Sequence, residues 1–514
     1  MTGLDDGDDQ LAALTRMLAA VTVSEKTGNR TNTLLQQLKL PAGVLEMLNS
    51  DQLDKQYTGV HAIRRAVSCT ERPPIKQVLD LGVTPRIVNL AIPRSVSPGS
   101  TQLRHYSEPE LKIATEAVWI LTNLVAGTTE EVLAVLNSTD VLVSLRVILL
   151  SPYARVNIEL ITTAVWCVGN LFGDSAEVAL MLHRADMMRV LLNVAKNPVT
   201  DTTRDFWLHL TWAMANACRF TKIDSNSYKK CFGAVEFFLA VMRSPPDPEI
   251  LQHAAVAISC LVDGPDERIR EYLKYEGAVE VVINTLLNSE DREVRYSCRR
   301  TIGNFITGDH EICEYVLQKG VLEAYEKSLI GKPDWDATKK PVKKEAFFLL
   351  SNLTAGTVQH VKRAVESPLY PLMLDSVAQG VDEHALREAA YVFANAASTL
   401  QPHPELLVHL LSEQARSIEC LLDIVKQLLA FRPNTLVRPV TLGVLVEFVN
   451  TIFDLSRQPK PFPVNDSLRR RMRVLTQAVH ELLILHGRQW DTTKADMAPH
   501  TYHWVDHGFP PAFQ

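Results

Sequence analysis

A tryptophan and an asparagine four residues apart recur in this 514-residue chain, each time before a short polar break. The clearest copies are AVWILTNLVAGT, AVWCVGNLFGDS and LTWAMANACRFT, and weaker copies follow them. A repeat of fixed period constrains the fold more than composition does, because each unit must bury its apolar face against the next unit. The positions equivalent to the tryptophan are 43 to 48 residues apart: Trp119, Trp166, Trp212, Val256, Arg300, Phe348 and Tyr391.

Each repeat predicts one long helix and two shorter ones. Over residues 158–172, apolar side chains recur at three- and four-residue steps, which predicts a helix with one buried stripe. Gly173, Asp174 and Ser175 then indicate the end of this helix and offer a polar cap for the next. Three helices per unit are typical of armadillo repeats, whereas two would indicate HEAT repeats. We therefore expect an all-α fold, a right-handed superhelical solenoid of armadillo repeats.

Charge, cysteine content and motif content exclude several classes of protein. The 53 Lys+Arg and 59 Asp+Glu residues give a formal net charge of −6, so direct nucleic-acid binding is not expected. The eight cysteines are scattered without a CxxC pair, which favours a reducing compartment. No apolar stretch approaches the ~18 residues of a membrane span, so no membrane insertion is expected. Because P-loop, GxGxxG and HExxH motifs are absent, we predict neither an enzyme nor a cofactor.

The repeated Trp and Asn residues are the strongest candidates for a binding surface. Residues four apart share a helix face, so the pairs would form a ladder along one surface of the stack. An Asn carboxamide matches one peptide N–H and one C=O, and indoles can hold Lys or Arg side chains between them. In the alternative interpretation, Asn caps helix turns and Trp fills the repeat interfaces. The pairs are Trp119/Asn123, Trp166/Asn170 and Trp212/Asn216.

The ordered repeats resemble importin alpha, the adaptor family that carries proteins with basic nuclear localisation signals. The resemblance runs from about residue 56 to 400 and includes HAIRRAVSCTERPPIKQVLDLGVTPRIVNL, SCLVDGPDERI, TIGNFITGD and REAAYVFANAAS in the family's order. It implies a nuclear import adaptor that binds basic signals as extended peptides in a concave groove, in the cytoplasm and nucleus. The residues that it implies for the major peptide-binding site are Trp119, Asn123, Gly127, Trp166, Asn170, Asp174, Trp212 and Asn216.

The resemblance also implies a second, minor site further along the chain. Phe348 and Tyr391 stand where the family has indoles, and their faces attract a cation less strongly than Trp does. We therefore expect a preference for basic signals with one cluster over those with two. The residues implied for this site are Arg300, Asn304, Phe348, Asn352, Glu388, Tyr391 and Asn395. In the major site, Gly127 and Asp174 match the pocket for the signal's most discriminating lysine, and Val132 replaces a Thr that many members have.

The N-terminal segment departs from the family. Residues 1–55 lack a recognisable form of the basic region through which importin alpha binds importin beta, so we expect no autoinhibition by that region, and importin beta stays an open candidate partner. The alternative function is therefore an armadillo scaffold or chaperone that binds basic peptides without importin beta. A cargo-releasing exportin would be a further partner of an adaptor. We expect the solenoid over residues 56–455, and a capping helix and tail over 456–514.

Two further clusters have ordinary interpretations. Residues 339–344, KKPVKK, resemble a basic signal, but a solvated start of the next long helix is the preferred interpretation. His500, His503 and His507 have a helix-compatible spacing for a metal ion. They lie in a C-terminal tail flanked by prolines, so we predict no metal site there.

Overall fold

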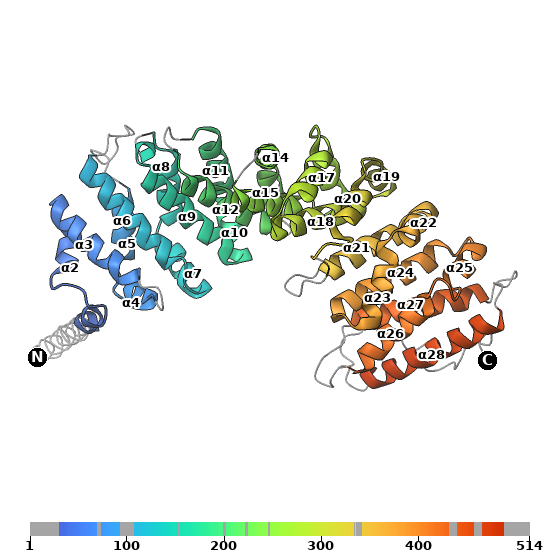
Figure 1. Cartoon of the computed structure of the whole chain (residues 1–514). Coiled ribbons are helices and arrows are strands. Elements are labelled where there is room, and N and C mark those ends of the chain that lie inside the picture. Colours follow the sequence, from blue (N-terminus) through green and yellow to red (C-terminus); the bar gives the residue numbers. More distant parts are fainter. Residues whose placement is uncertain are drawn as a thin grey trace, which may run out of the picture. The chain divides into compact units, whose positions relative to one another are not determined.

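The computed structural model shows an all-α protein built of armadillo repeats (Figure 1). The chain forms two compact units, Met1–Val241 (unit 1) and Met242–Gln514 (unit 2). The continuity of one solenoid over residues 56–455 stays a prediction. The structure describes residues 30–68, 73–92, 107–152, 154–198, 202–220, 225–244, 247–333, 335, 342–430, 439–456 and 465–487.

Unit 1 repeats a pattern of one long helix followed by two shorter helices. The 17-residue helices α6 and α9 are each followed by two helices of 9 or 10 residues, which confirms the armadillo prediction. The elements are α2 (Val44–Asn49), α3 (Leu53–Val67), α4 (Ile75–Asp80), α5 (Thr84–Ala91), α6 (Glu108–Leu124), α7 (Thr129–Ser138), α8 (Val141–Leu150), the 3-10 helix η1 (Ala154–Val156), α9 (Ile158–Asp174), α10 (Ala176–Arg184), α11 (Met187–Lys196), α12 (Arg204–Arg219), α13 (Ser225–Phe232) and α14 (Val235–Arg243), the last of which crosses the boundary in sequence.

Unit 2 follows the same pattern. Its long helices α15, α18, α21, α24 and α27 pack in sequence order, as α3, α6, α9 and α12 do in unit 1. The elements are α15 (Pro248–Leu261), α16 (Asp266–Leu273), α17 (Ala278–Asn288), α18 (Arg292–Ile306), α19 (His310–Gln318), α20 (Val321–Leu329), α21 (Val342–Thr354), α22 (Val358–Glu366), α23 (Leu369–Gln379), α24 (Glu383–Thr399), α25 (Pro404–Leu410), α26 (Ser417–Ala430), α27 (Pro439–Ser456) and α28 (Asp466–Gly487).

Helix α9 shows why the sequence forms these elements. Its aliphatic stripe, which includes Ile161 and Val168, is fully buried against the neighbouring helices. The Asn157 side chain accepts a hydrogen bond from the backbone N–H of Leu160 and caps the start of the helix. The helix ends at Asp174, as predicted, and the Ser175 hydroxyl caps α10 by accepting from Val178 N–H. Local caps and a buried stripe therefore set the boundaries of the repeat.

The buried thiols behave as small apolar side chains. Burial raises the pKa of Cys167 and of Cys298 to about 12, so both thiols stay protonated at neutral pH. In the part of the chain that the structure describes, no single helix is both long and apolar enough to cross a bilayer, although the bent pair α7–α8 passes that test jointly. No group of three metal-ligating side chains occurs among the described residues, and His500, His503 and His507 lie outside them.

Candidate functional site

The three indoles of unit 1 lie in register on its long helices. Trp119 is on α6, Trp166 on α9 and Trp212 on α12, and each ring is half-buried. One side of each ring is covered from within the chain. The covering groups are the Arg64 guanidinium, 5.2 Å from the Trp119 ring centroid, the His209 ring, 5.1 Å from that of Trp166, and Gly169, where a Cβ would lie 2.4 Å from Cζ3 of Trp212. The rings are therefore partly structural and partly accessible.

The asparagines form a series of hydrogen bonds that join successive repeats. Thr122, Ser259 and Ser351 lie in the last turns of α6, α15 and α21, and Ser351 O also accepts hydrogen bonds from Ala355 N–H and from the Thr354 hydroxyl. Each of these carbonyls accepts a bond from an Asn one repeat later. The bonds of this kind are Asn170 Nδ2 to Thr122 O (3.0 Å), Asn216 Nδ2 to Gly169 O (3.1 Å), Asn304 Nδ2 to Ser259 O (3.2 Å) and Asn395 Nδ2 to Ser351 O (2.9 Å), while Asn123 Nδ2 donates to Ser68 Oγ (3.3 Å).

These hydrogen bonds amend the expectation that the whole carboxamide faces a ligand. One N–H of each hydrogen-bonded amide is already engaged inside the stack. Asn170 is half-buried and keeps its carbonyl oxygen and second N–H for a ligand, whereas Asn216 and Asn304 are buried, at 2% and 5% exposure. In Asn216, Oδ1 is buried and has no hydrogen-bond partner among the described residues. Asn352 departs from the pattern, because its buried Nδ2 has no partner there. The inter-repeat bond fixes the amide plane and so orients the remaining groups.

Asp174, at the end of α9, places a carboxylate beside the tryptophans and asparagines of the long helices, which we call the Trp/Asn row. Its Oδ1 accepts a hydrogen bond from the Thr129 hydroxyl at 3.4 Å, across from the first turn of α7. Among the residues that the structure describes, no group hydrogen-bonds to the buried Oδ2 and no cation pairs with this carboxylate. An unpaired carboxylate oxygen removed from water is costly, and an ammonium or guanidinium would relieve that cost.

The two positions that accompany Asp174 in the predicted lysine pocket have clear structural roles. A Cβ on Gly127 would lie 2.3 Å from Oε2 of Glu131, the carboxylate that caps Thr128 N–H at 2.9 Å. A side chain at position 127 would therefore displace the Glu131 carboxylate from this cap. Val132 is fully buried, so a hydroxyl there would face the core. The sequence did not single out Thr129, which supplies a hydroxyl to Asp174 instead.

In unit 2 the corresponding positions hold Arg300, Phe348 and Tyr391 on α18, α21 and α24. All three side chains are half-buried. Phe348 packs on Gly303, where a Cβ would lie 3.3 Å from Cδ1 of the ring, as Trp212 packs on Gly169 in unit 1. One aromatic side chain of each unit thus packs on a glycine of the preceding long helix.

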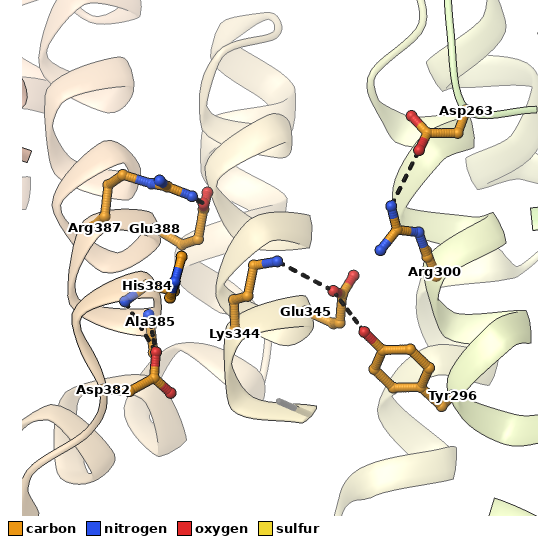
Figure 2. Close-up of polar contacts among 10 residues, drawn as sticks. All are labelled: Asp263, Tyr296, Arg300, Lys344, Glu345, Asp382, His384, Ala385, Arg387 and Glu388. Atoms are coloured by element: carbon orange, nitrogen blue, oxygen red, sulfur yellow. Dashed lines mark hydrogen bonds and ion pairs between the residues drawn. The ribbon is translucent and has the colours of Figure 1, made fainter. Parts of the chain in front are cut away.

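The carboxylates around this second row are paired within the chain. Figure 2 shows three ion pairs, of which two join adjacent residues of one helix and one joins α18 to the segment after α15, together with the Asp382 cap of α24. Glu345 and Glu388 are buried, at 4% and 6% exposure. The contacts are Arg300 Nη2 to Asp263 Oδ2 (3.1 Å), Lys344 Nζ to Glu345 Oε1 (3.6 Å), Tyr296 O–H to Glu345 Oε1 (3.1 Å) and Arg387 Nη2 to Glu388 Oε1 (2.8 Å).

The charged side chains of this network interact electrostatically in a region that is partly removed from water. Burial and the negative charge of Glu345 raise the pKa of Tyr296 to about 12. Desolvation lowers the pKa of Arg300, but Glu345 and Asp263 outweigh it and raise that pKa above its usual value. Arg300 therefore stays charged and belongs to the same network as Glu345.

Sequence reasoning missed most of the paired side chains, although a signal was present. Glu116, Glu345 and Glu388 each stand three residues before an aromatic position of the row, and only Glu388 was predicted. Glu345 and Glu388 occur in the similar segments KEAFF and REAAY, with the pairing cation directly before the acid. The third glutamate, Glu116, pairs with Arg64 at 2.8 Å and with His61 at 3.2 Å on α3.

Curated proteins similar to this chain are importin alpha subunits. Importin subunit alpha-1a of Oryza sativa subsp. japonica is 26% identical over 319 residues, covering 62% of this chain and 54% of that protein. Importin subunit alpha-B of Dictyostelium discoideum is 32% identical over 287 residues, covering 55% and 50% respectively. The chain thus spans about half the length of the curated relatives it matches. The resemblance to importin alpha seen in the sequence is confirmed, and no family model matches the chain.

A solved structure independently supports the fold. The crystal structure of an engineered protein superposes with a TM-score of 0.61 at 21% identity, covering 85% of this chain and 98% of that one. A designed armadillo repeat protein matches at 18% identity with a TM-score of 0.42, over 51% of this chain and 98% of its own.

Proposed function

We propose that this chain is an importin alpha-like adaptor that binds basic nuclear localisation signals of cargo proteins in the cytoplasm and nucleus. The observation that carries the proposal is the carboxylate of Asp174, which lies beside the Trp/Asn row and has no pairing cation in the described part of the chain. The similarity to importin alpha subunits supports the same assignment.

The proposed binding mode follows from the groups that remain free. An extended peptide would donate backbone N–H bonds to the amide oxygens of the half-buried asparagines, such as Asn170, whose amide plane is fixed by its bond to Thr122 O. A lysine ammonium would pair with Asp174 and replace the missing partner of Oδ2. Neighbouring lysine stems would lie on the accessible sides of Trp166 and Trp212. The chemistry selects extended basic peptides.

A peptide titration tests this proposal. We expect the purified chain to bind a lysine-rich peptide, and Asp174→Lys to weaken it by several kcal/mol, because an attractive charge becomes a repelling one. Trp166→Ala should cost less, about 1–3 kcal/mol. Asp140→Lys is the matched control, since Asp140 is exposed at the start of α8 and its reversal changes the net charge equally. Equal binding by the wild type and both site variants would reject the proposal.

The second candidate function differs from the first in whether the chain binds importin beta. Residues 1–55 carry few basic residues, namely Arg16, Lys26, Arg30, Lys39 and Lys55, which favours an armadillo scaffold or chaperone that binds basic peptides without importin beta. A pull-down separates the two candidates. Stoichiometric capture of importin beta through residues 1–55 supports the transport adaptor, and peptide binding without such capture supports the scaffold. A cargo-releasing exportin is a proposed partner of the adaptor only.

A further inference from the structure

The minor-site carboxylate Glu388 already holds a cation of this chain (Figure 2). Arg387 brings both Nε and Nη2 to Oε1 of Glu388, at 3.3 and 2.8 Å. The two side chains are only 19% and 9% exposed, so the pair is largely removed from water. A charge-assisted bond in such a site is stronger than its exposed equivalent.

A peptide cation would have to displace this guanidinium. Arg387 is the direct neighbour of Glu388, so it competes at the high effective concentration of a tethered group. The same arrangement recurs one repeat earlier, where Lys344 precedes Glu345 and lies 3.6 Å from its carboxylate. Asp174 in unit 1 differs, because its buried Oδ2 has no hydrogen-bond partner among the described residues. The carboxylates of Asp174 and Glu388 therefore offer a ligand cation opposite electrostatic conditions.

We infer that Arg387 is a specificity-determining residue that occupies the cation position at Glu388, so that the chain selects peptides with one basic cluster and rejects a second cluster at unit 2. This inference rests on the proposed function and deepens it by naming the ligand class. The tethered guanidinium, rather than a missing carboxylate, sets the preference.

The preference for one basic cluster could arise from the Arg387 charge or from weak aromatic contacts, and these two explanations can be separated. Tyr391 and Phe348 attract a cation less strongly than an indole would, and that weakness alone could disfavour a second cluster. Tyr391→Trp strengthens the aromatic face and leaves the Arg387–Glu388 pair in place. Arg387→Gln removes the competitor and leaves the aromatic row unchanged. The two substitutions therefore separate the explanations.

The experiment measures binding of a peptide with one lysine- and arginine-rich cluster to the full chain carrying Asp174→Lys, in which the unit 1 site is disabled. Adding Arg387→Gln should tighten the remaining binding about tenfold, because Glu388 becomes available. Arg387→Met keeps the aliphatic stem and should give the same gain. Adding Glu388→Gln to either variant should abolish it. Circular dichroism melting confirms that each variant is folded.

The control is Arg363→Gln on α22, which removes the same charge from a pair with Glu314. It reports the general effect of lowering the positive charge and should give little gain. Equal gains in Arg387→Gln and Arg363→Gln, or a gain only in Tyr391→Trp, overturn the inference. If the wild-type chain binds the peptide normally, such a result rejects the role of Arg387 alone. A wild-type chain that does not bind the peptide rejects the proposed function as well.

Discussion

Trp212 lies directly on Gly169, so closely that a Cβ at position 169 would stand 2.4 Å from Cζ3 of the indole. The ring is rigid and half-buried, and it cannot yield without shifting α12 against α9. We predict that Gly169→Ala destabilises unit 1 by about 1–3 kcal/mol through overpacking. The better helix propensity of Ala recovers up to about 1 kcal/mol of that loss. A lower urea midpoint by circular dichroism is the expected result.

Gly303→Ala provides the matched comparison in unit 2. There the new Cβ would lie 3.3 Å from Cδ1 of Phe348, a distance that a small ring movement can accommodate. The propensity gain should roughly cancel the crowding, and the urea midpoint should stay nearly unchanged. Equal destabilisation by both substitutions would contradict the close packing of Trp212 on Gly169.

The asparagines also contribute to the stability of the fold, and a second prediction measures this contribution. Asn170→Ala removes the bond to Thr122 O and leaves that carbonyl of the last turn of α6 without its partner. We expect a loss of about 1 kcal/mol in the free energy of unfolding, together with weaker peptide binding. Asn137→Ala, at an exposed position on α7, is the control and should change neither quantity. Weaker binding at undiminished stability would show that the inter-repeat bond contributes nothing to the fold.

The repeat period and the helix boundaries were accessible from the sequence because they depend on local patterns. The end of α9 at Asp174, with the Ser175 cap, follows from the polar break after the aliphatic stripe. The covering of Trp119 by Arg64 was not accessible. These residues are 55 positions apart, and their contact depends on the rotation of α3 against α6, which a period does not fix.

The paired glutamates were missed for a related reason. A Lys-Glu or Arg-Glu dipeptide on a helix usually indicates a solvated face. Glu345 is buried because the Tyr296 side chain of α18 packs over α21 and donates to it, a contact between repeats. The importin alpha resemblance supplied Glu388, whereas Glu345 in the same register required the structure.

A third prediction concerns acid stability. The Lys230 ammonium, 2.8 Å away, and Arg189 lower the pKa of Asp186 below its usual value. A depressed carboxyl pKa adds stability above the unfolded-state pKa of about 3.9, and this is lost as pH falls through the folded-state value. Asp186→Asn should thus cost up to ~1 kcal/mol near neutral pH and almost nothing near about pH 2. Asn also tolerates the φ of 61° at this position, so the substitution adds no backbone strain.

Urea midpoints of the wild type and Asp186→Asn across the acid range check this sign. The two curves should converge as pH falls. Curves that stay parallel from neutral to acid pH would show that Asp186 contributes no charge-dependent stability.

The last prediction tests whether a cation of this chain also weakens peptide binding at Trp119, the first of the three tryptophans in unit 1. Arg64 lies 5.2 Å from the centroid of Trp119 and pairs with Glu116 at 2.8 Å, so both an indole face and a carboxylate are occupied. Arg64→Gln should free them and tighten a lysine-rich peptide about two- to fivefold, the worth of one exposed cation–π contact. Arg65→Gln removes the same charge from an exposed neighbour on α3 and should give a smaller gain. Weaker binding in Arg64→Gln would mean instead that Arg64 holds Trp119 in its binding orientation, and isothermal titration calorimetry distinguishes the two outcomes.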